Sequence, residues 1–401
     1  MDDQPELPSR RGDRTVFGTR RLFAFCGALA VLTVPGLVRA YPQWQFTSGA
    51  SRCTQCHFAP GGGGLITGYG RDAVGEELST FEGDGAFLHG AAELPSLLTI
   101  GGNLRGALLA NDVQDPSGTS YAAFPMQADL NVRLALPWGI SVAGSVGLRG
   151  QVRDEEAVVP TQNYQPISTS RLVSREHHIT WMPARQGPYA KLGRYYAPFG
   201  LRLAEHVTYV RRDLGFNLLE ESYNLSLGYL AAEWEAHVTG FLPDELRHMG
   251  ATESGVAAYY EHRLLDRLAL GGQMRLGFDE GMDRLVTGVV GKFHLPILRT
   301  LFLAEANLVH QMFDSGQVGS RQQVVGALGF AVLPVRGLMI TVLGERNHVD
   351  TDVRDAAWNA LTGFVNWFPY AHVELQLIGR LQFAAGEDPA KTAMAQIHYF
   401  L

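Results

Sequence analysis

Hydrophobic and polar residues alternate one by one along several stretches in the second part of the chain. Residues 127–136 place Gln, Asp, Asn and Arg on one face and Ala, Leu and Val on the other, and residues 372–383 repeat the pattern. A period of two residues is typical of a β-strand with one polar and one apolar face. A soluble sandwich of two sheets shows the same alternation, so the pattern predicts strands without deciding how they are arranged.

The connections between these strands are of two kinds, which alternate along the chain. Short turns are expected at residues 137–139, 183–188, 231–233, 264–267, 296–300, 334–337 and 369–371. Long polar connections are expected at residues 111–121, 153–170, 201–217, 244–254, 278–283, 313–321, 347–355 and 386–391. The segments between them are about 9–14 residues long, which is the length of a tilted transmembrane strand.

Short turns at one end and long loops at the other are typical of an outer-membrane barrel. Fifteen connections join sixteen strands. A chain that begins in the periplasm makes its first and last connections on the outer side of the membrane, and in this sequence the first and last connections are both long. We therefore predict an all-β fold: a transmembrane antiparallel β-barrel of about 16 strands over residues 95–401, in contact with outer-membrane lipid. A homotrimer is compatible with such a barrel.

Two further features agree with a barrel. Residues 393–401 resemble the C-terminal strand by which outer-membrane assembly recognises barrels, although the chain ends on Leu401 after Tyr399 and Phe400. Aromatic residues near the segment ends are expected to form interfacial girdles. They are Trp138, Trp181, Tyr195, Tyr196, Tyr259, Tyr260, Trp358, Trp367, Phe368 and Tyr370.

The composition narrows the class of protein. The chain has 401 residues, of which 46% are hydrophobic and 18% are charged, and this excludes disorder. The 46 glycines and the 10% of aromatic residues suit many strands and turns. A mean hydropathy of -0.03 is low for a helical membrane protein. The formal charge of -7 comes without a basic tract, so nucleic acid is not an expected partner.

The first 40 residues have the pattern of a secretory signal. Several arginines precede an apolar run at residues 22–38, and Val38-Arg39-Ala40 has small or apolar residues at the cleavage positions. A membrane anchor is the alternative, but glycine and proline interrupt the run, which is short for a span of roughly 20 residues. Cleavage after Ala40 would remove Cys26 and deliver a chain with two cysteines to an oxidising compartment.

Those two cysteines form the sequence Cys53-Thr54-Gln55-Cys56-His57. A zinc site would need two more ligands of suitable spacing, and a redox dithiol needs no histidine. Covalent haem explains every part of the motif, because two thiols add to the porphyrin vinyl groups and the adjacent imidazole ligates the iron. We predict one covalent haem c.

The stretch around the motif resembles a known family. Cys-His-Phe-Ala-Pro-Gly-Gly-Gly-Gly at residues 56–64, followed by Tyr69-Gly70, is similar to the "CHxxPxGGG…YG" segment of bacterial outer-membrane barrel proteins with a single c-type haem. These proteins occur among porin–cytochrome electron-transfer systems. The resemblance implies that Cys53 and Cys56 attach the haem, and that His57 is its proximal ligand. Between the signal and the first strand, residues 41–94 are expected to form a haem segment on the periplasmic side, packed against the barrel mouth or plugging the lumen.

The sixth iron ligand is less strongly indicated. His89 is the only histidine between the motif and the first predicted strand, and a methionine ligand would have to come from the barrel, where Met126 is the first. We expect His89 to be the ligand, with five-coordinate iron as the alternative. Ligation by two histidines gives a lower potential than ligation by histidine and methionine, which suits electron transfer.

Two other polar stretches bear on function. Residues 201–217 are expected to fold into the lumen as a constriction rather than remain a plain loop. Residues 175–178, Arg-Glu-His-His, are expected to line a polar lumen or lie at a strand end, because the inward face of a barrel is polar. The two adjacent histidines point to opposite faces of a strand, which argues against a shared metal. There is no nucleophilic triad, Walker loop or paired-carboxylate arrangement, so no enzymatic activity is expected.

The sequence thus predicts a haem-bearing outer-membrane barrel that takes part in electron transfer at or across the membrane. One haem at one mouth cannot bridge a hydrocarbon band roughly 25 Å tall, so a partner cytochrome is expected, either periplasmic or threaded through the pore. The alternative is a diffusion porin in which the haem segment serves as a plug, sensor or assembly element.

Overall fold

The computed structural model describes residue 46 and residues 52–112, 120–149, 172–217, 220–244, 252–313 and 319–401. The predicted signal at residues 1–40 and the predicted long connection at residues 153–170 lie outside the described residues, as do parts of three other predicted long connections.

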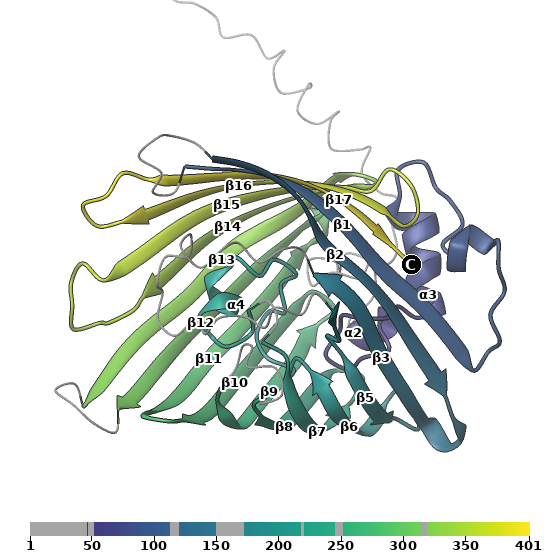
Figure 1. Ribbon diagram of the computed structural model, residues 1–401, viewed down its shortest axis with the longest axis horizontal. Coiled ribbons are helices and arrows are strands. Elements are labelled where there is room, and N and C mark those ends of the chain that lie inside the picture. The colour runs from purple at the N-terminus through teal and green to yellow at the C-terminus, as the bar shows by residue number, and fades with distance from the viewer. Residues whose placement is uncertain are drawn as a thin grey trace, which may run out of the picture. The chain divides into compact units, whose positions relative to one another are not determined.

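The strands form one closed antiparallel barrel, in which each strand pairs with the next and the first pairs with the last (Figure 1). Strands β4 and β5 both pair with β3 and are two parts of one interrupted strand, so the 17 strand segments make 16 strands. The predicted fold class is therefore confirmed. The segments are β1 Leu98–Asn111, β2 Ser120–Ala135, β3 Ile140–Arg149, β4 Leu172–Val173, β5 His177–Trp181, β6 Gly187–Tyr195, β7 Ser222–Leu230, β8 Trp234–Leu242, β9 Ser254–Leu265, β10 Leu268–Asp279, β11 Met282–Leu295, β12 Thr300–Phe313, β13 Ser320–Val335, β14 Leu338–His348, β15 Ala357–Trp367, β16 Val373–Ala384 and β17 Ala390–Phe400.

The predicted short turns all join consecutive strands, but one predicted long connection is wrong. Between β10 and β11, Asp279 pairs with Met282, so only Glu280 and Gly281 remain in the turn. Gly281 has a φ of +83°, a left-handed conformation that glycine adopts without steric cost. The acidic residues that made this stretch look like a long loop lie at the ends of the strands and in the turn itself.

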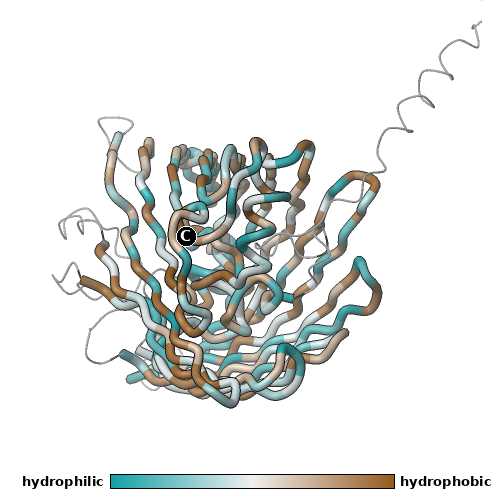
Figure 2. The backbone as a smooth tube through the Cα atoms, turned by 90° about the vertical axis from the view of Figure 1, so that its right-hand side faces the viewer, coloured by the Kyte–Doolittle hydropathy of each residue, from teal (hydrophilic) through white to brown (hydrophobic). Residues whose placement is uncertain are grey.

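Burial in the barrel is inverted relative to a water-soluble protein. In β7, Ser226 is 1% exposed, whereas its neighbour Leu227 is 55% exposed. The same alternation of hydrophilic and hydrophobic positions runs along many strands (Figure 2). Apolar side chains face outward because the surrounding solvent is hydrocarbon, and polar ones face a lumen.

Charged residues that face the lumen are paired with one another. Buried charges need partners because their desolvation is costly. The pairs include Arg194 with Asp244 and Glu221, Arg275 and Arg284 with Glu253, Lys292 with Glu261, and Arg380 with Glu345.

The expected aromatic girdles are only partly formed. Trp138 and Tyr370 are exposed near short turns, as an interfacial girdle requires. Tyr195, Tyr259 and Phe368 are buried instead, and the first two bond to lumen residues: the Tyr195 hydroxyl contacts Ser226, and the Tyr259 hydroxyl donates to Glu261. An aromatic residue at a strand end therefore does not by itself identify a lipid-facing position.

The residues before β1 form a compact segment of short helices: α2 Cys53–Cys56, α3 Gly68–Ala73, η2 Val74–Leu78 and η3 Phe87–Gly90. Hydrogen bonds attach it to the barrel at the end with the short turns. The backbone N–H groups of Thr80 and Phe81 donate to the carbonyls of Phe368 and Pro369 at 2.8 and 2.9 Å. The predicted domain boundary at residue 94 lies between η3 and β1.

The other short helices lie between strands: η4 Pro137–Gly139, α4 Tyr209–Arg212 and η6 Pro296–Leu298. Within the described ranges, none of the helices has the length and apolar character needed to cross a membrane.

The outward position of Leu227 predicts a large cost for a charge there. Replacing Leu227, in the middle of β7, by Arg should destabilise the barrel by about 2–4 kcal/mol, because a guanidinium would enter the hydrocarbon. Leu265→Arg, next to a short turn, should cost only about 0–1 kcal/mol. Urea unfolding of the barrel in lipid vesicles measures both. Equal costs at the two positions would contradict the lipid-facing assignment of β7.

Candidate functional site

The Cys53–His57 motif forms one helical turn with a defined start and end. The side chain of Gln55 accepts a hydrogen bond from the backbone N–H of Arg52 at 3.1 Å, which caps the turn. The backbone N–H of His57 donates to the Cys53 carbonyl at 2.8 Å, and His57 itself is extended, so the helix stops there. Cys53 and Cys56 stand at the two ends of this turn: the Cys53 sulfur lies beside Arg202, and Cys56 is buried against Ala73 and Tyr69.

The four glycines after the motif reverse the chain. Gly62, Gly63 and Gly64 have φ values of +80°, +75° and +60°, a run of left-handed residues that side chains other than glycine rarely tolerate. The reversal brings Ile66 back beside His57, with which it forms a bridge. A Cβ atom at Gly62 would lie 3.3 Å from the Cys53 sulfur, so the missing side chain also lets the turn approach the thiol.

The Tyr69-Gly70 pair lies in the first turn of α3, a helix that packs against the motif. Thr67 caps this helix by accepting from the Gly70 N–H at 3.1 Å, and its own hydroxyl donates to the Gln55 carbonyl at 2.7 Å. A Cβ atom at Gly70 would lie 2.6 Å from the carbonyl oxygen of Cys56, closer than atoms can approach. Glycine at this position is therefore required for α3 to contact α2.

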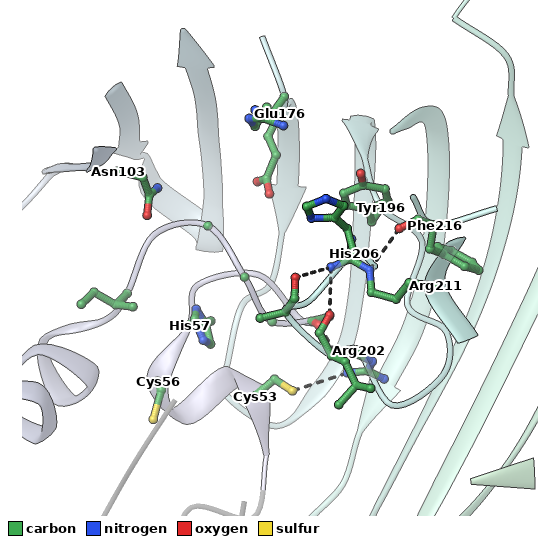
Figure 3. Close-up of a pocket in the computed structure, with 18 of the residues that line it drawn as sticks. Cys53, Cys56, His57, Asn103, Glu176, Tyr196, Arg202, His206, Arg211 and Phe216 are labelled. Carbon is green, nitrogen blue, oxygen red and sulfur yellow. Dashed lines mark hydrogen bonds between the residues drawn. The ribbon is translucent and has the colours of Figure 1, made fainter. Parts of the chain in front are cut away.

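The motif opens onto a cavity inside the barrel. The cavity has a volume of about 460 Å³, and Cys53, Cys56 and His57 all line it (Figure 3). Its other walls come from the glycine turn, from β1 and β2, and from residues 196–216. They include the apolar side chains of Phe199, Leu201, Leu203, Val210 and Phe216 and the cationic side chains of Arg105, Arg175, Arg202 and Arg211.

Residues 201–217 fold into the lumen, as the sequence predicts, and α4 contacts β13 and β14. The backbone N–H groups of Leu201 and Tyr209 donate to the carboxylates of Glu305 and Glu345 at 2.8 and 2.6 Å. Both carboxylates belong to strands remote from β6 and β7, which this loop connects. We call residues 201–217 the lumen loop.

One arginine holds the lumen loop in shape. Arg211 donates from Nη1 to the carbonyls of Leu203 and Ala204, at 2.8 and 2.9 Å, and from Nε to the carbonyl of Phe216 at 3.0 Å. These bonds join both halves of the loop through one rigid guanidinium. The backbone around the cavity is therefore fixed by hydrogen bonds within the loop as well as to the barrel wall.

A second arginine connects the lumen loop to the cysteine motif. Arg202 forms an ion pair with Glu235 at 3.0 Å, and its Nη1 lies 3.5 Å from the Cys53 sulfur (Figure 3). Burial alone would lower the pKa of Arg202, but the Glu235 carboxylate outweighs burial and raises it. Arg202 is therefore a permanent cation beside the first thiol.

Burial keeps both thiols of the motif protonated. It raises the pKa of Cys53, although Arg202 opposes the shift, and it raises the pKa of Cys56 to about 12. Redox dithiols need a lowered pKa, so the raised pKa values of the two thiols disfavour a reactive redox dithiol.

The structure brings together three of the four predicted site residues. His89 lies in η3 with its ring centroid 4.8 Å from that of His372, and its Nε2 is 3.4 Å from the Tyr399 hydroxyl. None of these three residues lines the cavity. Since η3 packs against the end of β17, outside the lumen, this placement does not support His89 as an iron ligand opposite His57.

Two histidines that the sequence did not single out as ligands do line the cavity. His206 comes from the lumen loop and His398 from β17. Burial, together with Arg211, Arg105 and Arg175, lowers the pKa of His206 to about 4, so its imidazole is neutral near neutral pH. Nothing in the local sequence distinguishes these residues, because the barrel brings them to the cavity from distant parts of the chain.

The Arg-Glu-His-His stretch lines the lumen without forming a metal site. His177 bonds to the Tyr223 hydroxyl at 3.2 Å, whereas His178 lies 3.5 Å from Glu176. Across the part of the chain that the structure describes, no group of three or more His, Cys, Asp or Glu side chains is arranged to hold a metal ion.

Comparison with known proteins shows a fold shared with outer-membrane proteins. No protein-family model and no curated protein matches the sequence. Among solved structures, the chain is similar to a loop-deletion mutant of OmpT, an outer-membrane protein of Vibrio cholerae (TM-score 0.58, 10% identity, covering 76% of this chain and 99% of that one). It is also similar to an anion-selective porin from Comamonas acidovorans (0.55, 11%, 76% and 99%) and to OprB of Pseudomonas putida (0.54, 11%, 76% and 94%).

The chain therefore has the porin-like fold of bacterial outer-membrane barrels. One expectation must be corrected. The absence of catalytic motifs led us to expect no enzymatic activity. The structural neighbours include OmpT, but a likeness at about 10% identity shows the fold alone, so whether this chain is an enzyme is not established. The barrel fold gives no ground for that expectation.

The contact between α3 and α2 predicts a local effect of substitution at Gly70. Gly70→Ala should force α3 away from the motif, at a cost of about 1–3 kcal/mol, because the new Cβ meets the Cys56 carbonyl. Limited proteolysis should then cut residues 53–94 faster while the barrel stays intact. Gly68→Ala is the matched control, since a Cβ there meets nothing within 4 Å. Equal proteolysis of both variants would contradict the packing requirement.

Proposed function

We propose that this protein is a haem-bearing outer-membrane barrel that takes part in electron transfer at or across the membrane. The observation that carries the proposal is the lumen cavity, onto which Cys53, Cys56 and His57 all open. Cys-x-x-Cys-His is the attachment motif of c-type haem, and a bound haem would supply one-electron iron chemistry.

The residues around the cavity fit a haem group. A volume of about 460 Å³ is in the range of small-molecule and cofactor sites. Leu201, Leu203 and Val210 provide apolar surface for a porphyrin, and Arg105 and Arg211 provide cations for its carboxylate groups. Cys53 and Cys56 would attach the group, and His57 would ligate its iron.

The chain's own residues set the conditions for electron transfer. The lumen loop covers the cavity with apolar side chains that restrict water, because Leu201 and Leu203 are buried and its backbone is tied to Glu305 and Glu345. A rigid surrounding reduces the reorganisation that accompanies a change of charge. Arg202, held by Glu235, keeps a positive charge beside the attachment site.

The position of the segment indicates where partners would act. Residues 53–94 contact the barrel at its short-turn end, and outer-membrane barrels keep short turns in the periplasm. This supports placing the haem on the periplasmic side. Since the lumen loop lies in the lumen and this segment lies at its short-turn end, a partner cytochrome that docks at a mouth fits better than one threaded through the pore.

A diffusion porin is the second candidate function. The structural neighbours include an anion-selective porin, and the cavity of this chain has several arginines in its wall. In this case the N-terminal segment would act as a plug, and solute passage would depend on it rather than on haem.

The first experiment tests the cofactor. A pyridine haemochrome spectrum of the purified protein should show one covalent c-type haem per chain, and Cys53→Ala/Cys56→Ala should abolish it, because both thioether bonds are lost. The signal must be compared with that of Gly68→Ala, which leaves the motif intact. A native protein without covalent haem would overturn the proposal.

The second experiment tests electron transfer. Liposomes carrying the protein and enclosing oxidised cytochrome c are exposed to dithionite, while liposome swelling measures solute passage in parallel. Native protein should reduce the enclosed cytochrome faster than Cys53→Ala/Cys56→Ala at equal swelling, because only the native protein carries haem. Equal reduction by the two proteins would favour the diffusion porin.

A further inference from the structure

We infer that His206, on the lumen loop, would be the second iron ligand of the haem that Cys53, Cys56 and His57 would hold. The inference rests on the proposed function and assigns a ligand that comes from the barrel instead of the N-terminal segment. Figure 3 shows His57 and His206 reaching the same cavity from these two parts of the chain.

The other histidine that lines the cavity is occupied. The Nδ1 of His398 is 2.9 Å from Glu374, and its Nε2 is 3.0 Å from Asn103, so both ring nitrogens have partners. Lys292 also lines the cavity, and its ammonium group is paired with Glu261 at 2.7 Å. Neither residue can bind iron without breaking an existing buried interaction.

His206 differs in this respect. Within the described residues, its imidazole makes no hydrogen bond to the protein. Most partly buried polar groups in proteins are hydrogen-bonded, so an imidazole without such a bond at a cavity wall is suited to bind a ligand or a metal.

The backbone on both sides of His206 is fixed. Before it, the carbonyls of Leu203 and Ala204 accept from Arg211; after it, the Thr208 hydroxyl donates to the Glu205 carbonyl at 2.9 Å, and the Tyr209 N–H donates to Glu345. The backbone of residues 205–207 is therefore restrained on both sides. A ligand held on such a preorganised loop binds with less loss of entropy than one on a mobile segment.

Met126 is the competing ligand. It lines the cavity and lies in β2 beside the register shift, where Arg105 pairs with Gln127 and Gly106 with Pro125, so Met126 has no partner residue on β1. Such a bulge can redirect a side chain. A thioether would give the haem a higher potential than a second imidazole would, so the two assignments differ in measurable properties.

The test compares His206→Ala with Met126→Leu in the full-length protein. His206→Ala should keep one covalent haem per chain by pyridine haemochrome, but the optical and electron paramagnetic resonance spectra of the ferric protein should change from low-spin to high-spin. Added imidazole should restore the low-spin spectrum by entering the vacated position. Met126→Leu should leave the spectra unchanged.

His206→Met supplies a second readout, because it should raise the midpoint potential while preserving six-coordinate iron. A low-spin spectrum that survives His206→Ala would overturn the assignment, as would a sulfur-to-iron charge-transfer band in the native protein that Met126→Leu abolishes. Absence of covalent haem from the native protein would instead overturn the proposed function, so the two failures are distinguishable. Heat-modifiable migration on gels checks that each variant has a folded barrel.

Discussion

A strand inside hydrocarbon has no water to satisfy its backbone, and this constraint governs the rest of the molecule. The sheet must close on itself, which here occurs between β1 and β17. Closure turns one face of every strand toward lipid and the other toward a lumen. The lumen-facing charges then need partners, and ion pairs such as Arg380 with Glu345 supply them.

The filled lumen provides a rigid setting for a site. The lumen loop covers apolar surface and donates its backbone N–H groups to wall carboxylates that belong to distant strands. Glu305 and Glu345 are costly to bury, but as acceptors they fix the loop across the width of the barrel. The cavity between this loop and the Cys53–His57 motif is therefore defined by the barrel as a whole.

Much of the barrel could be predicted from sequence because its causes are local. Alternation with period two sets the faces of each strand, and turn residues set their ends. The predictions that failed concern residue types that occur in two different structural settings. Acidic residues around Gly281 indicated a long loop but lie at strand ends, and Tyr195 and Tyr259 looked like girdle residues but bond inside the lumen.

The candidate site was predictable only in part for a related reason. Cys53, Cys56 and His57 are adjacent in sequence, so their chemistry can be read directly. The residues that complete the cavity come from β1, the lumen loop and β17, and only closure of the barrel brings them together. His89 is near the motif in sequence, whereas His206 reaches the cavity from the lumen loop.

The attachment of the N-terminal segment also sets an order of events during assembly. Thr80 and Phe81 bond to residues 368 and 369, between β15 and β16, and Gly102 exchanges backbone bonds with Leu401, next to β17. The segment cannot dock until the final strands are in place. The position of Cys53 and Cys56 beside the cavity therefore depends on closure of the barrel.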